Sequence, residues 1–170
     1  MNRIFTYLFF AIILVFASCV DKPTYPSQPV IAYKGFIKYG APAAPDSVEL
    51  VVSFTDEEGD IGLSQSDTQG IFKSGNLYMI YFFWDTTGGT GHWSAYDTDP
   101  ATPKIDSLIF AYRVPQVIPD GGKDEPMKGL IFAKIKPFIN PYNKIKFEVY
   151  LYDKALHKSD TIYTPAITFP

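Results

Sequence analysis

A two-residue alternation of apolar and polar side chains is the feature that most constrains how this chain can fold. Alternation at this period puts successive side chains on opposite faces of a strand, whereas an amphipathic helix needs a period of 3.6. Clusters of Gly, Pro, Asp and Asn separate the alternating segments, as turns do. The pattern predicts seven strands, over residues 30–39, 47–54, 77–84, 106–114, 127–135, 144–152 and 161–169.

Seven strands without a convincing helical stripe favour an all-β fold. We expect a single immunoglobulin-like β-sandwich of about seven antiparallel strands over residues 30–170. A small closed β-barrel is the alternative. The side chains expected to share a face are Ile31, Tyr33, Ile37 and Tyr39 in the first strand, Val48, Leu50, Val52 and Phe54 in the second, and Ile145, Phe147, Val149 and Leu151 in the sixth.

Residues 1–18 have the build of a secretory signal, with a basic start followed by an apolar run. The run from residue 4 to residue 18 is shorter than the roughly 20 residues that a membrane-spanning helix needs. The sequence FASC at 16–19 is similar to the lipobox of bacterial lipoproteins, although Phe16 replaces the usual leucine. This similarity implies that Cys19 is diacylated and becomes the new N-terminus.

Cys19 is the only cysteine, so the chain cannot form an internal disulfide, and lipidation would account for the leftover thiol. The alternative is an ordinary thiol beside an ordinary signal peptide. Residues 19–29 contain three prolines and no apolar pattern, which indicates an extended tether. We therefore expect a lipoprotein of the bacterial outer membrane, held by its N-terminal lipid and facing either the periplasm or the exterior.

The charge of the predicted mature chain argues against a nucleic-acid partner. Without residues 1–18, which hold one basic residue, the chain has 14 Lys and Arg against 18 Asp and Glu, a net charge of −4. Proteins that bind nucleic acid usually present a basic face.

Two segments carry a resemblance to a known family. The loop FTDEEGDIGL (54–63) and the closing segment VYLYDKALHKSDTIYTPAITF (149–169) resemble uncharacterised lipoproteins of Bacteroidota. Those proteins combine an F-x-D-x-x-G-D-I-G loop with a Y-D-R-A-x-N-K-S-N-x-x-x-T-P segment, in which Lys154, His157 and Asp160 replace an Arg and two Asn here. The resemblance implies an exported lipoprotein with an immunoglobulin-like sandwich, and it implies no activity.

Acidic residues gather in three connections that an immunoglobulin-like topology brings to one end of the sandwich. They are Asp56, Glu57, Glu58, Asp60, Asp67, Asp120, Asp124, Glu125, Asp153 and Asp160. Calcium prefers six to eight oxygen ligands, carboxylates included. We therefore consider a calcium site formed by Asp56, Glu58, Asp60 and Asp153. The competing interpretation is a polar turn, in which the acids cap backbone amides and Ile61 packs under the sheet.

The glycine-rich connection 85–104 carries Trp93 and Tyr96, which we expect near the other end of the sandwich. Long loops are often functional, and exposed aromatic rings suit contacts with sugars or peptides. Trp93 and Tyr96 are therefore candidate ligand-binding residues. The alternative is that Trp93 folds back onto the sheet as a lid.

Sequence motifs for catalysis are missing. The chain has no G-x-S-x-G elbow, no H-E-x-x-H pair and no phosphate-binding glycine loop, and the two histidines, His92 and His157, are expected at opposite ends. We therefore expect a non-enzymatic protein without a cofactor other than possible calcium. Its expected role is a structural or protein-interaction module that contacts another envelope protein. The alternative is a glycan-binding accessory lipoprotein that uses Trp93 and Tyr96.

Overall fold

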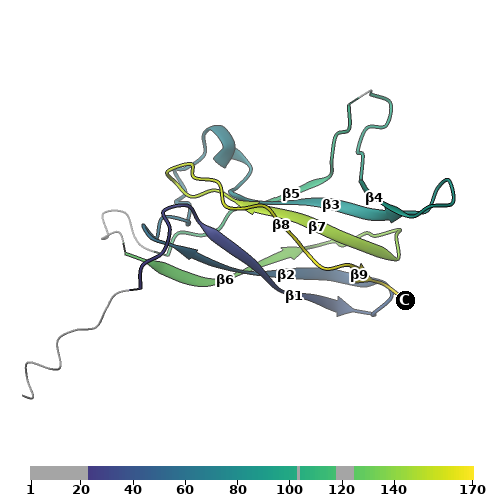
Figure 1. Cartoon of the computed structure of the whole chain (residues 1–170), viewed down its shortest axis with the longest axis horizontal. Coiled ribbons are helices and arrows are strands. Elements are labelled where there is room, and N and C mark those ends of the chain that lie inside the picture. The colour runs from purple at the N-terminus through teal and green to yellow at the C-terminus, as the bar shows by residue number, and fades with distance from the viewer. Residues whose placement is uncertain (1–22, 103, 118–124) are drawn as a thin grey trace, which may run out of the picture.

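The chain folds into an all-β sandwich of two antiparallel sheets, as predicted (Figure 1). A computed structural model describes residues 23–102, 104–117 and 125–170. The smaller sheet has three strands, in the order β1 (Val30–Gly40), β2 (Pro45–Asp56) and β6 (Met127–Ile135). The larger sheet contains β3 (Leu77–Asp85), β4 (His92–Ala95), β5 (Ile109–Tyr112), β7 (Lys144–Leu151), β8 (Ile162–Tyr163) and β9 (Ile167–Thr168). A 3-10 helix, η1 (Gly70–Lys73), lies in the connection between the sheets.

The core forms between β2 of the smaller sheet and β7 of the larger sheet. The alternation in these strands correctly predicted the inward faces, because all eight side chains assigned to them are buried: Val48, Leu50, Val52, Phe54, Ile145, Phe147, Val149 and Leu151. The ring of Phe147 contacts the rings of Phe36, Tyr81 and Phe110. Strand β3 is central in its sheet, between β7 on one side and β4 and β5 on the other. Leu77, Met79 and Tyr81 on its inner face are buried, and the apolar side chains on its outer face are half-buried.

The alternation in β1 was interpreted wrongly beyond Tyr33. A β-bulge shifts the pairing with β2 between Tyr33 and Gly35. The extra residue reverses which side chains face the core. Phe36 therefore packs against the core, whereas Ile37 and Tyr39 are exposed.

The predicted last strand, 161–169, is split into β8 and β9. Pro165 lies between the two pieces and has no amide hydrogen to donate to the ladder with β7. Thr164 replaces the missing ladder contact, because its amide donates to Phe147 O and its Oγ1 accepts from Phe147 N.

In a seven-stranded immunoglobulin sandwich, the fourth strand lies beside the fifth strand. The predicted fourth strand of this chain has a different partner. Here β5 pairs with β3, with Leu77 opposite Tyr112 and Ile80 opposite Ile109. The only strand that pairs with β6 within the described residues is β2. No strand of residues 23–102, 104–117 and 125–170 therefore pairs along the other edge of β6, the open edge.

The expectations for the N-terminus fall largely outside the described residues. These comprise the predicted signal at 1–18, the lipidated Cys19 and the start of the tether. In the parts of the chain that the structure describes, no helix is long and apolar enough to cross a membrane.

We predict that Phe147→Ala lowers the free energy of unfolding by about 3–5 kcal/mol, because it removes a fully buried ring and leaves a cavity between the sheets. Urea denaturation followed by far-UV circular dichroism measures the change. Ile139→Ala is the matched control, because Ile139 is 85% exposed and should change stability by less than about 0.5 kcal/mol. Equal effects of the two substitutions would contradict the assigned core.

Candidate functional site

A buried asparagine holds together the end of the sandwich at which β2 and β7 finish. The Nδ2 group of Asn76 donates to Ile61 O at 2.6 Å and to Tyr152 O at 2.9 Å, and its Oδ1 accepts from Val114 N at 3.0 Å. The Asn76 backbone also bonds to Tyr112 O and to Tyr152 N. This residue, just before β3, therefore joins three connections that are distant in sequence.

The FTDEEGDIGL segment forms a tight turn after β2, as the competing interpretation predicted. Asp56 Oδ2 accepts from Asp60 N at 3.0 Å. Gly59 has a φ of 70°, which glycine adopts without strain. Ile61 is buried under the sheet. Gly62 lies so close to the Pro115 and Gln116 backbone that a Cβ would be 2.4 Å from Gln116 Cα.

The same turn also brings carboxylates together, as the calcium interpretation predicted. Asp56, Asp60 and Asp153 each offer an oxygen, and these oxygens all lie within 4.8 Å of one another. Asp153 comes from the hairpin after β7, where His157 N donates to its Oδ1 at 2.7 Å and His157 Nδ1 lies 2.9 Å from its Oδ2. Lys154 N donates to Asp60 O at 3.2 Å, which holds the hairpin against the turn. These three acids are therefore the residues that could hold a cation.

Burial and mutual repulsion alter the acidity of this cluster. The pKa of Asp56 is raised to about 6, mainly by burial and also by the charges of Asp60 and Asp153, while hydrogen bonds from backbone amides oppose the shift. Burial, followed by the charge of Asp153, raises the pKa of Asp60. The hydrogen bond with Asp153 raises the pKa of His157. The site therefore concentrates negative charge in a place poorly reached by water.

The other predicted acids are placed differently. Glu58 is not one of the three clustered acids, but its charge helps to raise the pKa of Asp60. Glu57 accepts a hydrogen bond from Tyr25 N in the tether, and Asp67 lies 3.4 Å from Lys154 Nζ. Asp160 is exposed. Asp120 and Asp124 lie outside the described residues.

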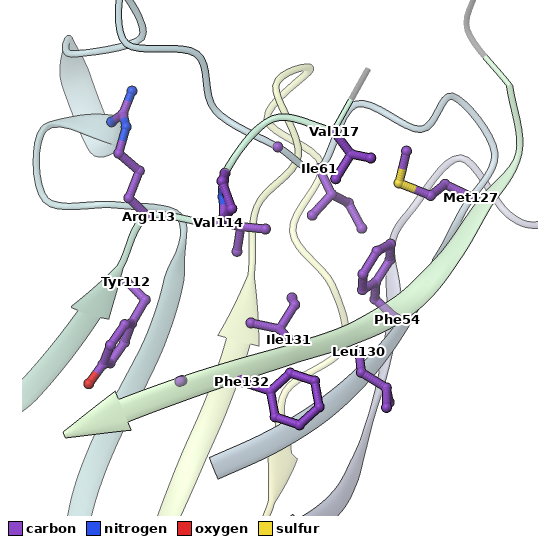
Figure 2. Close-up of a pocket in the computed structure, with 13 residues that line it drawn as sticks. Phe54, Ile61, Tyr112, Arg113, Val114, Val117, Met127, Leu130, Ile131 and Phe132 are labelled. Carbon is purple, nitrogen blue, oxygen red and sulfur yellow. The ribbon is translucent and has the colours of Figure 1, made fainter. Parts of the chain in front are cut away.

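An apolar groove of about 300 Å³ lies next to the acidic turn, between β6 and residues 112–117 (Figure 2). Phe54 and Ile61 form its floor with Val114 and Ile131, and Val117 and Met127 lie at one end. Arg113 points away from the groove and donates to the carbonyl oxygens of Ser64, Asp67 and Phe72. The groove itself is therefore almost wholly apolar.

The open edge of β6 borders this groove. Tyr112 Oη donates to Lys134 O, which places that carbonyl on the edge away from β2. Alternate residues of a strand direct their backbone groups to the same side. Leu130 and Phe132 therefore present their N–H and C=O groups along the open edge, and their side chains are more than half exposed.

The structure separates the two predicted ligand-binding aromatics. Trp93 lies in β4 opposite Trp84, on the outer face of the larger sheet. Tyr96, three residues later, packs against the core near Tyr81 and Tyr142. An odd separation along an extended chain puts two side chains on opposite faces. Trp93 and Tyr96 therefore do not share one face of the sheet, and ligand binding by either residue stays a prediction.

The outer face of the larger sheet instead combines tryptophan with lysine. The Trp84 and Trp93 rings meet edge to face, with centroids 5.2 Å apart. Lys144 Nζ lies 4.1 Å from the Trp84 centroid, and Lys146 Nζ lies 4.8 Å from that of Trp93. We did not identify Lys144 and Lys146 from the sequence, although their two-residue spacing in a predicted strand would have put them on one face.

Ser159 and His157, which are close in sequence to two acids, do not form a nucleophile and base. The Ser159 hydroxyl accepts from Leu151 N and donates to Asp160 O. The His157 ring is hydrogen-bonded to Asp153. Ser159 is also buried, so its hydroxyl serves to close the hairpin.

Comparisons of the chain with models of protein families, with curated proteins and with solved structures found no match. The resemblance to Bacteroidota lipoproteins therefore stays a prediction, and the function must be argued from the geometry.

We predict that Asn76→Ala lowers the free energy of unfolding by roughly 3 kcal/mol, since it leaves Ile61 O, Tyr152 O and Val114 N without their buried partner. Urea denaturation measures the loss. Asn143→Ala is the control, because the Asn143 side chain is exposed. A loss as small as that of the control would show that the amide does not hold the three connections.

Proposed function

We propose that this protein is a lipid-anchored, non-catalytic module of the bacterial envelope that binds an extended segment of another envelope protein. The bound segment adds as a strand along the open edge of β6. The observation that carries the proposal is the position of that edge, with which no strand pairs in the described part of the chain, beside an apolar groove. The lipobox-like sequence at 16–19 supports the lipid anchor. The contacts of Tyr25 and Gln28 with the domain support its orientation relative to the membrane.

Strand addition uses backbone hydrogen bonds for affinity and pockets under alternate side chains for specificity. The edge at Leu130 and Phe132 supplies the backbone groups. The groove supplies the apolar floor, where Phe54, Ile61 and Ile131 would contact every second side chain of the added strand. A fourth strand of the smaller sheet would occupy this position in a seven-stranded immunoglobulin sandwich.

Charge favours a partner with acidic flanks over a second copy of this chain. Lys128 and Lys134 are exposed near the two ends of β6. Antiparallel self-pairing that sets Leu130 opposite Phe132 would also set Lys128 opposite Lys134, and like charges directly opposite are destabilising. An apolar strand with an acid at each end would instead pair with both lysines.

The described part of the tether, residues 23–29, does not line the groove. Tyr25 N donates to Glu57 Oε2 at 2.6 Å, and Gln28 Nε2 donates to Lys158 O at 2.7 Å. Both contacts lie at the end of the sandwich where β1 begins (Figure 1). A lipid at Cys19 would therefore hold that end toward the membrane, with the β6 edge along the side of the domain.

The test is an isothermal calorimetry titration of the purified protein with the synthetic peptide Glu-Val-Thr-Val-Thr-Val-Glu. We expect a dissociation constant below about 1 mM. A peptide N-methylated at every second amide, on the side that faces β6, should not bind. Phe132→Pro removes an edge N–H that does not pair with β2 and should abolish binding. No binding by the unmodified protein at 1 mM peptide would refute strand addition.

Glycan binding is the second candidate, because lysines lie over the outer-face tryptophans. A pyranose ring can stack on an aromatic ring, and the lysines would attract acidic sugars. On this reading Trp93→Ala abolishes binding to an acidic member of a polysaccharide panel but leaves the peptide titration unchanged. Phe132→Pro should instead abolish peptide binding and leave polysaccharide binding unchanged. Undiminished polysaccharide binding by Trp93→Ala, or none by the unmodified protein, would rule out this candidate.

A further inference from the structure

We infer that Asp56, Asp60 and Asp153 bind one calcium ion between the turn after β2 and the hairpin after β7. This site is separate from the β6 edge, and the inference does not depend on the proposed function. Three observations carry it: the spacing of the carboxylate oxygens, the buried oxygens without donors, and the local charge.

The spacing suits a single ion. Calcium binds oxygens at about 2.3–2.6 Å, so two ligands on opposite sides of one ion lie at most about 5 Å apart. The three carboxylates offer oxygens that are all within 4.8 Å of one another. They come from two connections that meet only in the folded chain, and Lys154 N already donates to Asp60 O between them.

The buried oxygens provide the independent observation. Asp56 is 0% exposed, and its Oδ1 has no hydrogen-bond partner within the described part of the chain. Asp60 Oδ1 and Glu58 Oε2 are also buried without a partner there. The hydrogen bond from Asp60 N, which closes the turn, goes to the other oxygen of Asp56. A buried acceptor without a donor is unfavourable and rare in native proteins, so capping of the turn does not account for these oxygens.

The charge points to a hard divalent cation. Asp56 is fully buried beside the carboxylates of Asp60 and Asp153. Of the nearby cationic side chains, Lys154 pairs with Asp67 and His157 with Asp153. An all-oxygen donor set of this kind suits calcium better than zinc or copper, which favour imidazole and thiolate. Glu58, carbonyl oxygens and water could complete the coordination.

The test is calcium titration of the purified, EDTA-treated protein, with thermal unfolding and isothermal calorimetry as readouts. We expect one calcium per chain and a melting temperature that rises by about 5–10 °C when calcium reaches 100 times its dissociation constant. Magnesium at the same concentration should give a smaller shift. No heat of binding and no change in melting temperature at 10 mM calcium would overturn the inference.

Two variants separate binding from the structure of the turn. Asp56→Asn and Asp60→Asn should each remove most of the calcium-induced shift. Asp56→Asn without calcium should melt no lower than the unmodified protein, because the amide oxygen can still accept from Asp60 N while the buried charge is gone. Asp160 lies in the same hairpin as Asp153, but it is exposed. Asp160→Asn should therefore keep the full calcium-induced shift in melting temperature. A full shift in both cluster variants, or a lower metal-free melting temperature of Asp56→Asn, would overturn the assignment.

Discussion

The hydrogen bonds of the Asn76 side chain are the interaction on which the candidate sites depend. A buried amide must satisfy both donors and its acceptor, and Asn76 does so with backbone groups of Ile61, Tyr152 and Val114. Each of these partners belongs to a different connection. The contact therefore positions the acidic turn, the hairpin after β7 and one wall of the groove at the same time.

The turn after β2 satisfies the interpretation as a polar turn and, with the hairpin after β7, also brings together three carboxylates that could hold a cation. One oxygen of Asp56 and the two glycines close the turn, and Ile61 secures it from below. The oxygens left over, Asp56 Oδ1 and Asp60 Oδ1, support the inferred cation because they are buried and have no donor among the described residues. Its apolar residues belong to the groove, so a single loop would connect an ion and a strand-binding surface.

The unequal sheets explain where a partner could bind. Strand β5 pairs with β3 and leaves the smaller sheet with three strands. Its own fourth position stays open beside β6, over apolar side chains that a sandwich normally covers. Lysines at both ends of β6 discourage self-association, a common protection of exposed strand edges. The same lysines would select an acidic partner.

Much of the fold was predictable from local sequence, because burial of one sheet face imposes a period of two that can be read directly. That pattern identified the inward faces of β2 and β7 and nearly all strand positions. It failed at β1, where a bulge at Gly35 shifts the register, and at the last strand, which Pro165 divides. The immunoglobulin-like topology was enough to predict that Asp56, Asp60 and Asp153 share one end.

Other features depend on contacts between residues that are distant in sequence. No local pattern reveals that Asn76 bonds to Ile61 and Tyr152, that β5 pairs with β3, or that Trp93 and Tyr96 lie on opposite faces. Side-chain alternation reports which face is buried, but it does not report which strand lies alongside. Strand pairing and the burial of single oxygens arise only when the two sheets close on each other, and they decide where the proposed ion and the proposed partner would bind.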